Sequence, residues 1–371
     1  MVWSDLARDK QCEIVYLFSS GKDVDEIGKL YNLKSTSIVR KMWTLKKIKC
    51  FDQMKEKGCN IIDAQSKITQ SLPSGNLSKS QTFLDMLQRR RMSSNPITDK
   101  TIFIKNPNAV INDRICFLEN QSWSIIYFTD LHCPYEDNDT INAALRVIKT
   151  IDHNLIINGG DNLDLYGLSS FAKDNNDLFK NNFKREISAH DVIMEKIAAT
   201  SSVPKLSLYG NHMHRYDKWL SNTPFVDIDS ITDLKLEHIL RMNYYGWFPF
   251  VGSIVIGDKN DDSFPKPILI FEHGTNASAG AGKSSLGKLK DYNATSYVMG
   301  HVHRLSVAYK RTLHGQHCTA EGGTMRGLNP DYVKYPDWQN GMLHINVDNG
   351  IVSITPILIF GKNAYIGNLK I

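Results

Sequence analysis

The stretch Phe128-Thr129-Asp130-Leu131-His132 predicts both the fold of this chain and its functional site. The apolar run Ile125–Phe128 indicates a buried strand, and Asp130 and His132 follow it two positions apart. Residues at i and i+2 share a side of an extended chain, so both side chains can contact one metal ion where the strand ends. An Asp-x-His pair is common by itself, so the prediction depends on the motifs that follow.

Four later stretches repeat this arrangement, each directly after a short apolar run. They are Gly160-Asp161, Gly210-Asn211-His212, Glu272-His273-Gly274 and Gly300-His301-Val302-His303. The apolar runs alternate with longer amphipathic segments such as 141–151 and 179–199, which predicts an α/β fold with helices on a central sheet. Ligands gather at the carboxyl ends of such strands, so we expect one site there.

The five motifs together offer three oxygen donors and four imidazoles: Asp130, His132, Asp161, Asn211, His273, His301 and His303. This mixture of donors suits Mn²⁺, Fe or Zn²⁺ better than Ca²⁺ or Mg²⁺. One ion cannot use all seven ligands. The set therefore predicts two divalent ions, about 3.5–4 Å apart, that share one carboxylate. We expect Mn²⁺, with Fe and Zn²⁺ as the alternatives.

The order Asp-x-His, Gly-Asp-x-x-Asp, Gly-Asn-His, His-Gly, Gly-His-x-His resembles the calcineurin-like metallophosphoesterase superfamily across residues 123–320. The resemblance implies a four-layer α/β sandwich, in which two mixed sheets are flanked by helices. It also implies two ligand sets that share Asp161 as a bridge. One ion would be held by Asp130, His132, Asp161 and His303, and the other by Asp161, Asn211, His273 and His301.

The same resemblance implies roles for two residues that do not bind metal. His212 would contact the scissile phosphate or protonate the leaving oxygen, and Asp164 matches the second acid of Gly-Asp-x-x-Asp. A water that bridges the two ions would be the nucleophile. The chain departs from many members of the superfamily, in which an acidic residue follows Gly-Asn-His. Here Met213, His214 and Arg215 follow, and His214 is one candidate for the missing partner of His212.

Residues 1–50 predict three helical segments. Asp23, followed by Glu26, fits an N-cap with a capping box, and the turn Asn32-Leu33-Lys34 comes before the next helix. Two short helices joined by such a turn resemble a helix-turn-helix DNA-binding unit, whose second helix enters the major groove. The candidate DNA contacts are Ser35, Thr36, Ser37, Arg40 and Lys41. The alternative is a small three-helix bundle that serves protein contact or dimerisation.

The charge of the chain is unevenly distributed. Residues 1–100 hold 18 Lys and Arg against 11 Asp and Glu, a balance of +7, and the remainder holds 26 against 28, a balance of −2. This excess predicts a polyanion partner for the N-terminal part, with a solvated basic surface as the alternative. The six scattered cysteines contain no CxxC pair, which predicts reduced thiols and a cytoplasmic setting. No apolar run approaches the ~20 residues of a membrane helix, so we expect no membrane partner.

Two further segments have competing interpretations. The sequence Gly280-Ala281-Gly282-Lys283-Ser284 resembles the end of a P-loop, but Ala277 stands where that motif requires glycine. We therefore expect a Gly/Ala/Ser loop close to the substrate, with Lys283 as a candidate phosphate contact. The aromatic cluster 244–250 favours packing over the core rather than stacking on a base or sugar.

These observations predict three parts: a helix-turn-helix-like domain at 1–50, a linker with helical and edge-strand elements at 51–122, and a metallophosphoesterase domain at 123–371 with a cap insert at 215–260. A DNA-binding unit joined to a phosphodiester-cleaving centre favours a DNA nuclease or DNA-end-processing phosphodiesterase. DNA is then the expected partner, and a homodimer is compatible with the motif. The alternatives are a protein or nucleotide phosphatase, or a non-catalytic DNA-binding protein with a vestigial metal site.

Overall fold

The computed structural model describes residues 11, 14, 15, 17, 18, 23–34, 38, 102–105, 110–169, 183–222, 234–258, 266–292, 295–330 and 334–371. The chain divides into two compact units, Met1–Lys79 and Ser80–Ile371. Among the residues in these ranges, no helix combines the length and the apolar composition needed to cross a bilayer.

The first unit contains helix α2 (Val24–Tyr31), whose two ends agree with the sequence prediction. Asp23 Oδ1 accepts hydrogen bonds from the backbone N–H groups of Asp25 at 2.9 Å and Glu26 at 3.1 Å, which satisfies two donors of the first turn. At the other end, Asn32 adopts a left-handed conformation with φ 52°, and this stops the helix. The candidate DNA contacts Ser35, Thr36, Ser37, Arg40 and Lys41 lie outside the described residues.

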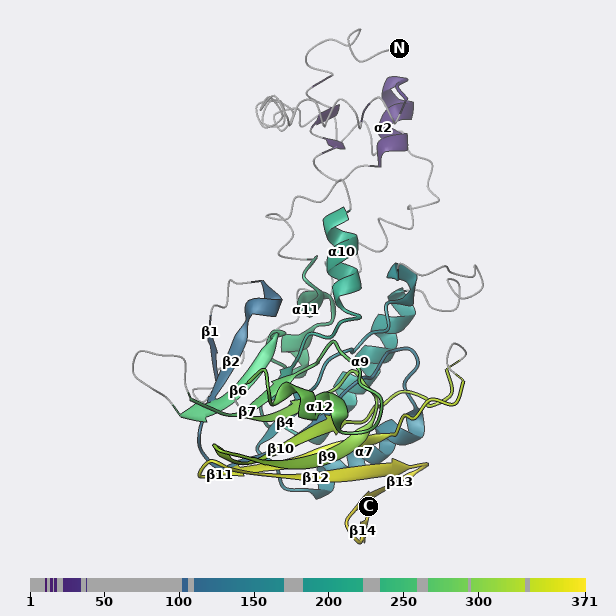
Figure 1. The fold of residues 1–371 in the computed structure, drawn as a ribbon. Coiled ribbons are helices and arrows are strands. Elements are labelled where there is room, and N and C mark those ends of the chain that lie inside the picture. The colour runs from purple at the N-terminus through teal and green to yellow at the C-terminus, as the bar shows by residue number, and fades with distance from the viewer. Residues whose placement is uncertain are drawn as a thin grey trace. The chain divides into compact units, whose positions relative to one another are not determined.

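The second unit is built on two seven-stranded sheets (Figure 1). Sheet A has the order β1-β2-β6-β7-β8-β10-β9, and sheet B has the order β14-β13-β12-β11-β3-β4-β5. The strands are β1 (Ile102–Lys105), β2 (Ile115–Glu119), β3 (Trp123–Phe128), β4 (Leu155–Asn158), β5 (Lys205–Ser207), β6 (Ser253–Asp258), β7 (Lys266–Glu272), β8 (Ser296–Met299), β9 (Leu305–Thr312), β10 (Gly315–Gly322), β11 (Gly341–Asp348), β12 (Ile351–Phe360), β13 (Asn363–Ile366) and β14 (Leu369–Lys370).

The sheets pack face to face because their strands alternate apolar side chains toward both faces. On β3, Ile125 and Tyr127 point into the core between the sheets, where the Tyr127 ring stacks on the Phe271 ring of β7. The intervening Ile126 and Phe128 point to the opposite face of sheet B and pack against helices. Strands buried on both faces are nearly continuous apolar runs, which is why the sequence revealed them.

Helices α7 (Asn138–Thr150) and α9 (Phe183–Thr200) cover the outer face of sheet B. The short helix α12 (Lys283–Lys288) lies on sheet A against β8 and β10. The remaining helical elements are α10 (His214–Asn222), α11 (Leu236–Ile239) and the 3₁₀ turns η2 (Ile111–Asp113), η3 (Tyr166–Leu168) and η6 (Met242–Tyr245). The predicted α/β sandwich of two mixed sheets with flanking helices is confirmed.

The local sequence predicts an edge strand at 115–118 and a helix at 231–242, and the structure differs from both predictions. Strand β2, expected at an edge, lies between β1 and β6 because it pairs parallel with β6. A continuous helix over 231–242 does not form among the described residues 234–242, since Arg241 with φ 52° separates α11 from η6. The packing interpretation of the aromatic cluster is confirmed, because Trp247 and Phe250 are fully buried in the core.

Candidate metal centre

The predicted motifs meet because their strands end side by side. Strands β3, β4 and β5 run parallel as neighbours in sheet B, and β7 and β8 run parallel in sheet A. Hydrogen bonds join the motifs across the two sheets: His301 N donates to Asp130 Oδ2 at 2.9 Å, and His273 Nδ1 lies 2.8 Å from Gly159 O. The tertiary fold thus gathers all five motifs at one edge of the sandwich.

The backbone turns sharply at these motifs. Five non-glycine residues there have φ between 47° and 68°, namely Asp130, His132, Asp161, His301 and His303. A left-handed conformation of this kind is unfavourable for a residue with a side chain and persists where the surrounding structure enforces it. Backbone bonds supply that constraint, since Asp130 N donates to Gly160 O at 3.1 Å and His132 N to Asp161 O at 2.9 Å. The strain directs the side chains toward a common point.

Each of the two central carboxylates is anchored by one oxygen. Asp130 Oδ2 accepts from Thr129 Oγ1 at 2.7 Å and from His301 N at 2.9 Å. Asp161 Oδ1 accepts from His212 N at 2.9 Å. The other oxygens, Asp130 Oδ1 and Asp161 Oδ2, therefore face the histidines.

A first group of donors surrounds Asp130 Oδ1. It lies 3.1 Å from His303 Nε2 and 3.4 Å from His132 Nε2, and these two nitrogens are 3.0 Å apart. Asp161 Oδ2 lies 3.8 Å from His132 Nε2. These four side chains are the set expected for one ion.

A second group surrounds Asn211 Oδ1. It lies 2.9 Å from His273 Nε2 and 2.8 Å from His301 Nδ1, and His273 Nε2 is 3.1 Å from Asp161 Oδ2. Asp161 Oδ2 thus lies between the two groups. The structure thus brings the seven candidate ligands together in these two groups.

The donors fit divalent cations. Ligand atoms about 2.1 Å from one ion lie roughly 3.0 to 3.4 Å apart at octahedral and tetrahedral angles, which matches most of these separations. Asp130 Oδ1 is buried and has no hydrogen-bond donor of acceptable geometry among the described residues. His132 Nδ1 lies 3.0 Å from Asp164 Oδ1, and this bond leaves the Nε2 lone pair directed at the cluster. An orphaned carboxylate oxygen among converging imidazoles is what a cation would satisfy.

The charges of the cluster compensate one another. Burial would raise the pKa of Asp130, but the charge of His303 and the close approach of the His132 and His303 rings hold it well below its usual value. For His132 burial would lower the pKa, yet its contact with the Asp130 carboxylate and its hydrogen bond with Asp164 raise the pKa to about 9. Burial acts in the same way on His273, where the Asp161 charge raises the pKa to about 9. A bound cation would compete with these protons for the same ionised carboxylates.

The two residues expected to take part in catalysis also lie together. His212 Nδ1 lies 2.8 Å from the backbone oxygen of Asp164 and 3.4 Å from Asp164 Oδ1. Because a carbonyl oxygen only accepts, Nδ1 carries the proton of this bond. The ring then presents Nε2 toward the cluster, 4.0 Å from Asp161 Oδ2. The His212 side chain is 18% exposed, so it forms part of the open side of the centre.

The suggestion that His214 replaces a missing acidic partner of His212 is wrong. His214 Nδ1 lies 3.4 Å from Asp217 Oδ2, and its ring packs against Tyr209. Beside Asp164, the side chain of Arg215 contacts His212, with Nη2 3.3 Å from His212 Nε2. Sequence reasoning missed Arg215, although a spacing of three residues places two side chains on the same side of a helical turn.

The loop before α12 does not bind phosphate in the manner of a P-loop. The N–H groups of Gly282, Ser284 and Ser285 donate to the carboxylate of Glu321 at 2.8, 3.1 and 3.3 Å. Glu321 is fully buried and therefore occupies the position that an anionic ligand would need. Lys283 is exposed, and its contact with a phosphate stays a prediction.

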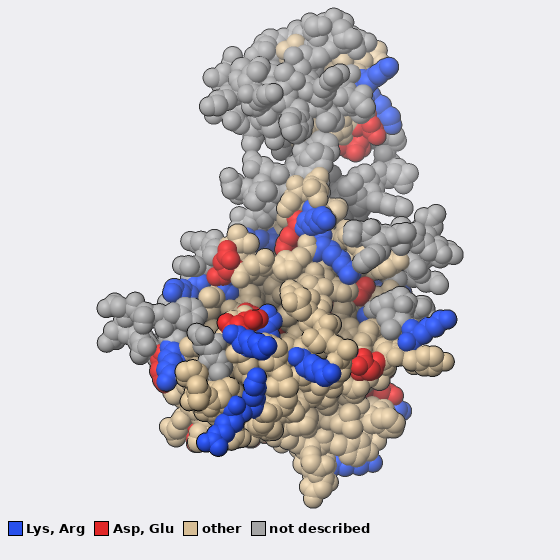
Figure 2. Space-filling model, in the orientation of Figure 1, with Lys and Arg blue, Asp and Glu red and all other residues tan. Residues whose placement is uncertain are grey.

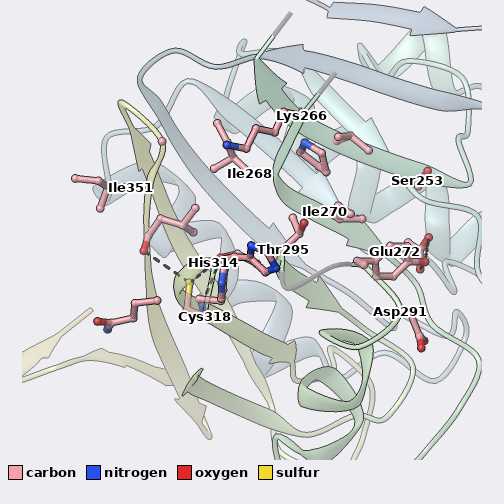
Figure 3. A pocket seen from close by; sticks show the side chains of 18 of the residues that line it. Ser253, Lys266, Ile268, Ile270, Glu272, Asp291, Thr295, His314, Cys318 and Ile351 are labelled. Atoms are coloured by element: carbon pink, nitrogen blue, oxygen red, sulfur yellow. Dashed lines mark hydrogen bonds between the residues drawn. The ribbon is translucent and has the colours of Figure 1, made fainter. Parts of the chain in front are cut away.

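A separate groove of about 1180 Å³ is lined mainly by residues of sheet A and also by Ile351 of β12 in sheet B (Figure 3). Its described lining includes Ile268 and Ile270 of β7, His314 and Cys318, and none of the seven candidate ligands. Glu272 faces this groove from the position before His273, but Tyr292 Oη donates to both of its carboxylate oxygens at 2.8 Å. The groove is therefore distinct from the metal centre.

A protein-family model matches the part of the chain that contains these motifs. Residues 124–305 match the family model described as calcineurin-like phosphoesterase. No curated protein matched the chain.

Solved structures of low similarity were also found. Vacuolar protein sorting 29 from Cryptosporidium parvum is 13% identical, covers 68% of this chain and 98% of its own, and has a TM-score of 0.38. The zinc complex of Entamoeba histolytica Vps29 is 11% identical, with 67% and 98% covered and a TM-score of 0.35. The Pseudomonas putida nuclease MPE is 13% identical, with 62% and 86% covered and a TM-score of 0.24. At these TM-scores the likenesses carry no argument about function.

Proposed function

Because residues 124–305 match the calcineurin-like phosphoesterase family model, we propose that this chain is a dinuclear-metal-dependent phosphoesterase that cleaves phosphodiester bonds in DNA. The observation that carries the hydrolytic part is the convergence of two donor groups on Asp161 Oδ2. That oxygen lies 3.1 Å from His273 Nε2 of one group and 3.8 Å from His132 Nε2 of the other. A carboxylate in this position can bridge two cations.

In this proposal the two ions have separate ligand sets. Asp130, His132, Asp161 and His303 hold one ion, and Asp161, Asn211, His273 and His301 hold the other. Mn²⁺ is the ion we propose, since the donors are mixed carboxylate, amide and imidazole and no cysteine is among them. Bound ions would supply an acidified water as nucleophile and positive charge for the phosphate oxygens.

Two side chains of the protein, Asp164 and His212, are proposed to orient the site and to transfer a proton. The bond from His212 Nδ1 to the Asp164 oxygen fixes the ring so that Nε2 faces the cluster. From that position a protonated Nε2 can donate to the leaving oxygen. Asp164 orients both this ring and that of His132, whose Nδ1 lies 3.0 Å from its carboxylate. Asp164 is therefore proposed as a positioning residue, and His212 as the general acid.

The choice of DNA as substrate rests on the N-terminal part. Residues 1–100 carry a charge of +7, whereas the remainder carries −2. On the face of the second unit seen in Figure 2, lysine and arginine side chains lie among uncharged residues and several aspartate and glutamate side chains. Proteins bind a phosphate backbone mainly through positive charge, so we assign DNA binding to residues 1–100.

The first test is hydrolysis of single- and double-stranded DNA beside bis-p-nitrophenyl phosphate, with Mn²⁺ added. The variants Asp161→Ala and His212→Ala are measured in parallel. Cleavage of DNA by the wild type and its loss in both variants would support the proposal. Cleavage of the small diester alone would mean that the centre works on another substrate, and phosphopeptides and nucleotides would be assayed next. Metal binding without any hydrolysis would favour the vestigial-site alternative.

A second test addresses the DNA contacts directly. We expect Arg40→Ala and Lys41→Ala in the full chain to weaken DNA binding and to reduce its salt dependence, because each removes one phosphate contact. Lys29→Ala removes the same charge from the last turn of α2 and is the matched control. Equal affinities in all three variants and the wild type would remove the support for the helix-turn-helix interpretation.

A further inference from the structure

We propose that Arg215 binds the phosphate of the substrate beside His212, and is thus a further substrate-contacting residue of this centre. The proposal deepens the phosphoesterase function proposed above and rests on it. Arg215 lies in the first turn of α10 (His214–Asn222), three residues after His212, and is half-buried.

One backbone oxygen fixes both side chains. Asp164 O accepts from His212 Nδ1 at 2.8 Å and from Arg215 Nη1 at 2.7 Å. The imidazole and the guanidinium are therefore held side by side with little freedom to move apart. Asp164 O belongs to the loop that follows β4, which also carries Asp161. The hydrogen bond to Asp164 therefore fixes the position of Arg215 relative to Asp161, the carboxylate proposed to bridge the two ions.

The free donor atoms of Arg215 point at the atom that would act in catalysis. Arg215 Nη2 lies 3.3 Å from His212 Nε2, and His212 Nε2 lies 4.0 Å from Asp161 Oδ2. A guanidinium has only N–H donors and no acceptor, so Nη2 donates and Nε2 accepts in this contact. A phosphate oxygen that enters the centre can replace Nε2 as the acceptor of Nη2. That exchange frees Nε2 to face the leaving oxygen.

Among the described residues, Arg215 has no carboxylate within ion-pair distance. Arg114 pairs with Glu237 at 3.1 Å and Arg304 with Asp337 at 2.7 Å, but within the described part of the chain Arg215 forms no ion pair. A guanidinium binds phosphate oxygens by charge-assisted hydrogen bonds in a planar fork. A guanidinium that forms no ion pair within the described residues, and that one nitrogen anchors beside His212, fits this role.

A purely structural role makes different predictions. Arg215 also lies near enough to the buried Glu186 for its charge to favour the ionised carboxylate. If stabilising that region and the Asp164 loop were its only role, substitution would lower stability without changing phosphate affinity in the folded, metal-loaded protein.

The test is binding of inorganic phosphate to the full-length, Mn²⁺-loaded protein by isothermal titration calorimetry. This readout does not require turnover. We expect Arg215→Ala to weaken phosphate binding by roughly 10- to 100-fold, and Arg215→Lys to weaken it less, while both variants bind as much Mn²⁺ as the wild type. Lys218→Ala removes the same charge from an exposed position of the same helix and should leave phosphate affinity unchanged.

Two results would overturn the inference. The first is a phosphate affinity of metal-loaded Arg215→Ala or Arg215→Lys within twofold of the wild type. The second is a wild-type protein that binds Mn²⁺ but no phosphate. If Arg215→Ala does not fold, the phosphate affinities of Arg215→Lys and Lys218→Ala are compared instead, and equal affinities would overturn the inference. Arg215-dependent phosphate binding by a protein that hydrolyses no phosphoester would support this inference while contradicting the proposed function, so the two failures are distinguishable.

Discussion

Glu186→Gln should make the protein more stable, and increasingly so as the pH rises. Glu186 is on α9, only 1% exposed, and its Oε2 accepts a hydrogen bond from Leu165 N at 2.9 Å. Burial raises the pKa of this carboxyl to about 8, and the neighbouring Asp164 charge adds to the increase, whereas the Leu165 bond opposes it. Glutamine keeps an oxygen for Leu165 N and has no proton to lose.

The size of the effect follows from proton linkage. Below pH 4.5, the ordinary pKa of glutamate, the folded and unfolded chains both carry the proton, and Glu186 contributes no pH dependence. Above that value the unfolded chain releases the proton, while the folded chain keeps it until pH about 8. Folding therefore becomes less favourable by up to about 1.4 kcal/mol per pH unit across this window. From pH 5 to pH 8 the advantage of Glu186→Gln should grow by about 3 kcal/mol, as an upper limit.

The assay is urea unfolding followed by circular dichroism at pH 5, 6.5 and 8, with a chelator present so that metal binding does not contribute. Glu195→Gln, an exposed position of the same helix, is the control and should show no such trend. A difference in unfolding free energy between Glu186→Gln and the wild type that stays constant from pH 5 to pH 8 would refute the reasoning, because Glu186 would then ionise alike in both states.

Three further substitutions test the centre and its surroundings. Asp161→Ala should reduce the number of bound Mn²⁺ ions from two to at most one, since both donor groups share Asp161 Oδ2. Mass spectrometry of the desalted protein counts the bound metal, and two retained ions would contradict the bridging role of Asp161. Gly160→Ala should lower the melting temperature and reduce the free energy of unfolding by about 2 kcal/mol, because φ is 106° and the added Cβ would lie 2.7 Å from His273 Nδ1. An unchanged melting temperature would show that the turn at Gly160 adjusts to the methyl group without strain. Glu321→Gln should destabilise the protein by about 2 kcal/mol, because the amide NH₂ of glutamine would face backbone N–H donors that the wild-type carboxylate accepts. Urea unfolding at neutral pH measures this loss of stability. A variant as stable as the wild type would contradict the anchoring of the Gly282–Ser285 segment by Glu321.

Much of the second unit follows from local pattern. The runs before Asp130 and Gly160 are strands because their side chains are apolar on both faces, and a strand buried on both faces needs no partner information to be recognised. The turn at Asn349-Gly350, with φ 47° and 81°, was equally predictable, since these residue types tolerate the left-handed conformation that a tight hairpin requires.

Other features depended on contacts that no local pattern contains. The place of β2 inside sheet A is decided by its pairing with β6, which is distant in sequence. The helix expected at 231–242 is interrupted at Arg241, where φ is 52°, and Met242 and Trp247 beyond it are buried in the core. Burial of neighbouring side chains here outweighs helix propensity, which contributes less than about 1 kcal/mol per residue.

The sequence by itself determined which residues could form the centre, because five short motifs contain all seven side chains that can donate to a metal there. The tertiary structure alone decided how those donors face one another, since the ends of β3, β4, β5, β7 and β8 meet only when the two sheets pack. It also decided the partner of His212. Met213, His214 and Arg215 all lie within three positions of His212, but the first turn of α10 and the Asp164 oxygen bring the Arg215 guanidinium to His212 Nε2. The orientation of a side chain is set by the backbone and hydrogen bonds around it, and these are fixed only in the folded chain.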